Sequence, residues 1–203
     1  MLKLIDVIAD EDDRPVTLEE LKGHVNAKDF SDDDAQLEIF LDAAIDFVAE
    51  RTSLTLRRSS WRVDRCDWWS GCLTVLLTPV RDVEITYLDE NGAPQTVDEN
   101  LYRWVRTDQG NAEICFLDGF TSPAVKVDTF NAVQIAIEAG FDQNPNQTGA
   151  GDDPELLFPA RARQVILMLA ASWYRNRESV SADDLKTVPL AADAMIWQLR
   201  VYR

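Results

Sequence analysis

Residues that commonly carry out catalysis are scarce in this chain of 203 residues. The only histidine is His24, so a nucleophile activated by an imidazole base would depend on that single side chain. Neither a G-x-x-x-x-G-K-[ST] loop nor a G-x-G-x-x-G loop is present, and the eight glycines are scattered singly. The sequence therefore predicts a protein that is not an enzyme.

The candidate metal ligands have spacings that do not match common metal sites. Cys66, Cys72 and Cys115 are odd in number and lack the C-x-x-C spacing of structural zinc sites. Such a set favours reduced, idle thiols in a cytosolic protein over the disulfide scaffold of a secreted one. The acidic runs 10–13 and 32–34 lack the glycine and closing glutamate of an EF-hand loop. We expect neither a metal nor a cofactor.

Tryptophans in the middle of the chain are the best candidates for binding a small ligand. Exposed indole rings can form a platform on which a sugar stacks, whereas buried ones belong to a core or an interface. An alternative function is therefore a carbohydrate-binding or hydrolytic module. The tryptophans concerned are Trp61, Trp68, Trp69 and Trp104.

Net charge limits the partners of the chain. It carries a formal charge of −16 at pH 7, which argues against binding nucleic acid by neutralising phosphates. Residues 1–50 are strongly acidic and residues 154–203 slightly basic. This asymmetry has two interpretations, a solvated surface or the acidic and basic faces of neighbouring copies in an assembly.

No segment has the sequence of a membrane span or a secretory signal. The longest apolar stretch, 165–174, is about half the length that a bilayer requires. The first residues lack a basic region and a cleavage site. We expect no contact with a membrane.

Helical periodicity is clearest near both ends of the chain. Thr17 is typical of a helix N-cap, and two glutamates follow in the first turn. Ser31 predicts the start of a longer helix that runs to about Leu54. Further helices are expected over 161–177 and, after a polar linker, from Pro189 onward.

The middle of the chain changes to the alternating pattern of β-strands. Asn91-Gly92 is a strong hairpin signal between two such segments. A polar loop at 142–153 leads back to the last helices. About six short strands are predicted, near residues 61–63, 73–77, 83–87, 102–105, 112–116 and 133–137.

These elements predict an α+β fold. The N- and C-terminal helices, residues 1–56 and 154–203, must pack together because neither set can bury its apolar face alone. We expect them to form a helical bundle into which residues 57–153 insert as a small antiparallel β domain.

Three segments in this order resemble the head–tail connector (adaptor) proteins of long-tailed phages and phage-like gene transfer agents. The first runs from Val16 to His24 (VTLEELKGH) and leads into the acidic helix start at 31–34. The second, Leu77 to Gly92, resembles a strand–Pro–strand–turn unit of the family. The third is the helix end Ala171–Glu178 (ASWYRNRE).

The resemblance implies a structural role in a virion or phage-like particle, assembled in the host cytoplasm. Such adaptors form a ring, typically of twelve copies, beneath the portal and receive a tail-side stopper or terminator protein. DNA passes through the ring without specific binding. Another head–tail joining protein, a stopper or terminator, is a third possibility, although the strong helices at both ends favour the adaptor.

The resemblance also suggests roles for particular residues. The C-terminal segment that would bind the portal contains Trp197, Leu199, Arg200, Val201, Tyr202 and Arg203. The acids that would line the DNA channel, and repel DNA from its wall, are Asp32, Asp33, Asp34, Glu38 and Asp42. The residues that would pack between subunits are Trp173, Tyr174, Arg175 and Arg177.

Overall fold

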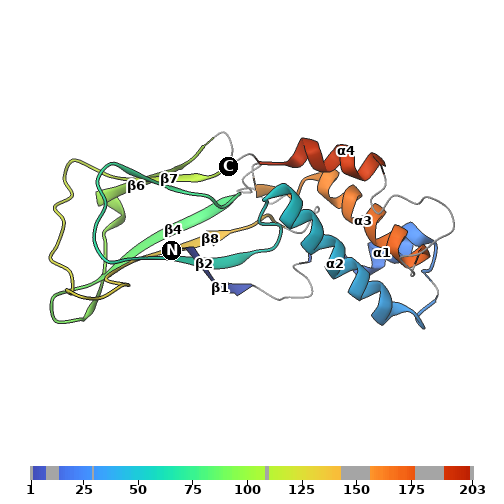
Figure 1. Cartoon of the computed structure of the whole chain (residues 1–203), viewed down its shortest axis with the longest axis horizontal. Helices are drawn as coiled ribbons and strands as arrows, with labels where there is room; N and C mark the ends of the chain where they lie inside the picture. The colour runs from blue at the N-terminus through green and yellow to red at the C-terminus, as the bar shows by residue number, and fades with distance from the viewer. Residues whose placement is uncertain are drawn as a thin grey trace. The chain divides into compact units, whose positions relative to one another are not determined.

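The computed structural model describes residues 2–7, 14–28, 30–107, 110–142, 156–176 and 190–201 (Figure 1). Over these residues the chain is a mixed α+β protein with antiparallel sheets, as predicted. It divides into two compact units. We call the first, within residues 1–8 and 57–140, the β unit, and the second, within 9–56 and 141–202, the helical unit.

Two antiparallel sheets make up the β unit. The larger contains five strands in the order β1-β2-β8-β4-β5, which are Leu2–Val7, Ser59–Arg65, Val133–Ala139, Val80–Leu88 and Pro94–Thr96. The smaller contains three strands in the order β3-β7-β6, which are Cys72–Val75, Ala112–Phe116 and Tyr102–Arg106. A short 3₁₀ helix, η2 (Glu99–Leu101), leads into β6.

One hydrophobic core fills the space between the two sheets. Val83 and Ile85 of β4 alternate with exposed Glu84, as the sequence pattern predicts for a strand with one buried face. Ile114 of β7 belongs to the same buried cluster. The Tyr102 hydroxyl donates a hydrogen bond of 2.9 Å to the Val83 carbonyl, which links the smaller sheet to the larger one. Burial, reinforced by nearby carboxylates, raises the pKa of this phenol.

The apolar residues at the start of the chain belong to the larger sheet. The sequence assigned residues 1–56 to the helices, but β1 pairs antiparallel with β2, with Leu2 opposite Val63. The division at residues 56/57 and 140/141 accordingly leaves β1 in the β unit. The reason is that backbone pairing with a strand more than fifty residues away outweighs proximity to the first helix along the chain.

The helical unit has four α-helices in its described residues: α1 (Leu18–Val25), α2 (Asp34–Thr52), α3 (Ala160–Arg175) and α4 (Leu190–Leu199). Helix α3 lies beside α2 and α4, and α1 contacts both α2 and α3 (Figure 1). Buried side chains from all four helices, including Leu21, Leu41, Leu169 and Ile196, form one core. After α4, the Val201 backbone N–H donates to the Thr52 carbonyl at 2.9 Å and fixes the following segment to the end of α2.

Helix starts are predicted unequally well. Thr17 caps α1 as expected, because its hydroxyl accepts from the Glu20 backbone N–H while the Glu20 carboxylate accepts from that of Thr17. The Ser31 start of α2 is wrong by three residues, since the helix begins at Asp34 after an N-cap at Asp33 that makes no side-chain capping bond. Three predicted features lie outside the described residues: most of the polar loop at 142–153, the polar linker and Pro189.

Candidate interaction surfaces

Within the part of the chain that the structure describes, no group of three or more His, Cys, Asp or Glu side chains could hold a metal ion. His24 is exposed on α1 and lines a shallow, open depression with Glu19, Glu20, Lys28 and Leu167. Among the residues that the structure describes, no serine, threonine or cysteine lines this depression. No helix among the described residues is long and apolar enough to cross a membrane.

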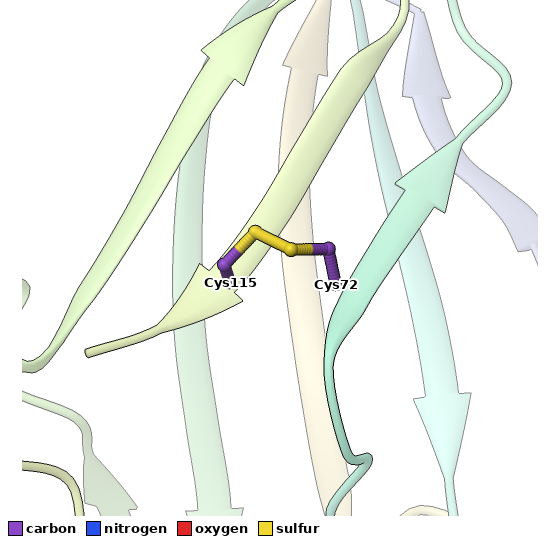
Figure 2. Close-up of a disulfide and its surroundings, with 2 residues drawn as sticks. All are labelled: Cys72 and Cys115. Atoms are coloured by element: carbon purple, nitrogen blue, oxygen red, sulfur yellow. A yellow bond between two sulfur atoms is a disulfide. The ribbon is translucent and has the colours of Figure 1, made fainter. Parts of the chain in front are cut away.

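The prediction of three reduced thiols is wrong. Cys72 of β3 and Cys115 of β7 form a disulfide (Figure 2). The two residues are directly opposite each other in the antiparallel register, with their Cα atoms 4.3 Å apart. A pairing of residues 43 positions apart depends on strand register, which the cysteine spacing does not contain. Cys66 is a free, exposed thiol.

Trp68, the central residue of the suggested sugar platform, is part of the fold of the β unit. Its indole N–H donates to the Pro123 carbonyl at 2.8 Å. Its ring lies 5.1–5.6 Å, centroid to centroid, from the rings of Tyr87, Phe116 and Phe120 in edge-on contacts. These contacts hold the loop after β7 against the sheets, and they do not favour the carbohydrate-binding alternative.

The other three tryptophans of that group are also half-buried. Trp69 lies against Phe116 with centroids 4.4 Å apart, and the Arg65 guanidinium is 5.8 Å from its ring. The Trp61 indole N–H donates to the Ser59 hydroxyl at 2.8 Å. Trp104 packs against the β-unit core. The four rings are therefore partners within the β unit rather than an open row.

Most of the acids suggested for a channel wall have partners within the helical unit. Asp34 pairs at 2.9 Å with the ammonium group of Lys22, whose side chain is buried. The Tyr174 hydroxyl donates to the Asp33 carboxylate at 2.6 Å. Asp32 is exposed and has neither of these contacts.

The two remaining acids share one cation. Glu38 and Asp42, one turn apart on α2, each lie 3.6 Å from the Arg14 guanidinium. Both carboxylates stay partly exposed, at about two-fifths of their side-chain surface. They remain accessible from solvent while they hold Arg14 against α2.

The residues suggested for packing between subunits also have roles within the chain. Trp173 packs edge-on against Phe47 of α2, with ring centroids 5.9 Å apart. Tyr174 bonds to Asp33, and Arg175 is exposed at the end of α3. Arg177 lies outside the described residues. Of the three described residues, Arg175 is thus the one that this chain leaves most open.

The C-terminal segment divides into buried and exposed side chains. Leu199 and Val201 pack against the helical core. Trp197 keeps 54% of its surface exposed, and the exposed Arg200 guanidinium lies 5.4 Å from its ring centroid. Tyr202 and Arg203 lie outside the described residues.

An exposed apolar turn went unnoticed in the sequence. Between β7 and β8, Val127 is 79% and Phe130 92% exposed. The available signal was a pair of apolar residues between polar ones in a segment that has no strand pattern. Large apolar side chains at such exposure are typical of contact surfaces.

No protein-family model matches the chain, and no curated protein matches it. Solved structures do. A chain from the neck of an empty gene transfer agent (GTA) particle, computed with C6 symmetry, matches with a TM-score of 0.70 and 24% identity, over 100% of this chain and 96% of that one.

Two further solved structures match this chain, with the same coverage of both chains and the same identity. One is the virion of a native gene transfer agent particle, with a TM-score of 0.70. The other is the neck of a native particle computed with C12 symmetry, with a TM-score of 0.68. At 24% identity these matches show a shared fold over the whole chain.

Proposed function

We propose that this chain is a head–tail connector (adaptor) protein of a phage or phage-like particle. The observation that carries the proposal is the shared fold, over the full chain, with components of a gene transfer agent neck and virion. The resemblance of three sequence segments to the adaptor family points to the same role independently. The role is structural rather than enzymatic, and its place is the neck of the particle.

In this role the chain forms a ring, and we propose twelve copies. The C12 symmetry of a matching neck structure supports that number. The ring lies beneath the portal, and a stopper or terminator protein binds its tail side. The chain is assembled in the host cytoplasm before it enters the particle.

The portal-binding segment is residues 197–203. Leu199 and Val201 position the segment, since they pack against the chain's own helices. Trp197 and Arg200 make the contact, since an exposed indole stacked with a guanidinium is a common centre of a protein interface. This assignment separates the two residues that bind from the two that orient them.

DNA passes through the ring without being held. Each copy brings a charge of −16, and an acidic wall repels phosphates where basic residues would bind them. Asp32 faces solvent without the partners that Asp33 and Asp34 have, and it contributes most to that wall. Glu38 and Asp42 contribute less because Arg14 offsets part of their charge.

Binding of the full chain to the purified portal of the same particle tests this proposal. We expect co-elution in size-exclusion chromatography, and a loss of at least about tenfold in affinity on Trp197→Ala or Arg200→Ala. Gln198→Ala, an exposed residue between these two positions, is the matched control. A wild-type chain that never associates with the portal would contradict the adaptor role. Equal losses in all three variants would contradict the assignment of Trp197 and Arg200.

A further inference from the structure

The two most exposed large apolar side chains of the described residues lie on one rigid turn. Val127 and Phe130 belong to residues 127–131, which we call the knob turn. The backbone is fixed on both sides, because the Lys126 N–H donates to the Leu88 carbonyl at 3.0 Å and the Leu88 N–H donates to the Ala132 carbonyl at 2.8 Å. Inside the turn, Asp128 adopts a left-handed φ of 57°.

This arrangement holds apolar surface in water rather than burying it. The same loop also contains Phe120 and Val125, which pack against the β-unit core. Phe120 and Val125 thus contribute to the core, whereas Val127 and Phe130 do not. A preorganised, exposed Phe loses little conformational entropy when it binds, which suits it to anchor an interface.

A second exposed apolar surface lies on the outer side of the smaller sheet. Because side chains alternate along a strand, the buried residues Val75, Ala112 and Ile114 point inward, and their neighbours point outward. We call this outward side the disulfide face. Its exposed apolar side chains are Leu76, Val105 and Leu117, and the Cys72–Cys115 disulfide joins β3 to β7 on this face.

Each of the two surfaces carries charges of both signs. The exposed residues Lys126 and Asp128 accompany the apolar side chains of the knob turn. The disulfide face carries exposed Arg103 and Glu113, one on each of two adjacent strands. Each surface therefore has one cation and one anion beside its apolar residues, so an attractive pairing of both charges is available.

A rotationally symmetric ring requires two such surfaces on every copy. In a cyclic assembly of more than two copies the contact is heterologous, so one patch of a subunit meets a different patch of the next. The knob turn and the disulfide face meet this requirement within a single unit. We infer that, in the ring assembled by this chain, the knob turn of each copy binds the disulfide face of its neighbour. This inference rests on the proposed ring.

Cross-linking between copies tests the contact directly. In the Cys66→Ser background, Phe130→Cys and Val105→Cys are combined, and the assembled chain is treated with a short bis-maleimide. We expect a ladder of covalent oligomers on a denaturing gel. Phe130→Cys combined with Ile5→Cys, an exposed residue on the larger sheet, is the matched control and is expected to give no ladder. A ladder from the control pair alone would overturn the inference.

A charged side chain placed in the knob turn tests whether the contact contributes to assembly. Phe130→Asp is expected to raise the concentration required for ring formation about tenfold or more, with an unchanged unfolding midpoint because the side chain is exposed. Lys126→Glu and Glu113→Lys are each expected to weaken assembly, and together to restore it. Rings of Phe130→Asp that form as the wild type does, but fail to recruit a tail-side protein, would overturn the inference and leave the adaptor proposal intact. A wild-type chain that forms no ring with its portal would overturn both.

Discussion

The helical unit and the β unit treat their exposed surfaces differently. In the helical unit, acids that are prominent in the sequence pair within the chain: Asp34 with Lys22, Glu38 and Asp42 with Arg14, and Glu20 with Arg163. In the β unit, apolar residues such as Phe130 and Val105 face solvent. The helical unit thus pairs several of its acids within the chain, whereas the β unit exposes the two most accessible large apolar side chains of the described residues, Val127 and Phe130.

This difference shows that the residues that stand out in the sequence are not necessarily the ones whose side chains are most exposed in the structure. The acidic cluster at 32–34 is conspicuous, yet two of its three residues stabilise the entry of α2. Val127 and Phe130 are inconspicuous, yet they are the most accessible large apolar side chains among the described residues. Substitutions in each unit measure how far it depends on its own internal contacts.

The largest effects are expected from the two buried cores. Leu169→Ala in α3 and Ile135→Ala in β8 each remove a fully buried side chain, and each is expected to lower the free energy of unfolding by about 2–5 kcal/mol. Chemical denaturation measures both changes. Ile39→Ala on the exposed side of α2 is the control and should change stability by less than about 0.5 kcal/mol. A control as destabilising as the core variants would mean that Ile39 is not at the surface.

Loss of the disulfide is expected to weaken the β unit alone. Replacing both Cys72 and Cys115 by serine opens a loop of 43 residues and is expected to lower the free energy of unfolding by about 2–4 kcal/mol. Hydrogen exchange should become faster in β3 and β7 and stay unchanged in α2 and α3. Cys66→Ser is the control. Equal exchange in both forms would show that the disulfide adds no stability to the smaller sheet.

A smaller effect is expected from the ion pair between α1 and α2. The Lys22 side chain is only 7% exposed and the Asp34 side chain about one-third exposed, so Lys22→Met is expected to cost about 1–2 kcal/mol. A double-mutant cycle with Asp34→Asn measures the coupling between the two charges. The exposed Lys28→Met is the control. Additive effects of the two changes would show that the pair contributes no interaction energy.

The smallest effect is expected in the β4–β5 turn, where it depends on pH. The backbone N–H of Ala93, together with that of Asn91 and the side chain of Gln95, holds the pKa of Asp89 below its ordinary value of 3.8. The resulting stability is complete above pH 3.8 and is lost as the pH falls through the lowered pKa. Thermal melts between pH 2 and 5 should therefore show a weaker pH dependence in Asp89→Asn than in the wild type. Glu90→Gln removes a neighbouring charge and should leave that dependence unchanged.

Local signals in the sequence predict much of the secondary structure. The N-cap at Thr17 and the alternation around Val83 and Ile85 each depend on a few consecutive residues, and the structure confirms both. The turn at Asn91-Gly92 does join two antiparallel strands. Its second strand, β5, was missed because Pro94–Thr96 is short and fully exposed and has no apolar alternation.

Features that depend on distant partners could not be predicted in this way. The start of α2 is set by Tyr174 and Lys22, which lie 141 and 12 residues from the acids that they bind. The disulfide depends on the register of β3 against β7, and the strand character of 2–7 depends on β2. The exposure of Phe130 likewise follows from how Leu88 anchors its loop, which no spacing in the sequence encodes.

Electron microscopy of the full chain mixed with its portal tests the central claim most directly. The adaptor account predicts a ring with rotational symmetry on one face of the portal, with twelve copies of the chain. A chain that remains monomeric in the mixture, with portals bare at both ends, would contradict it.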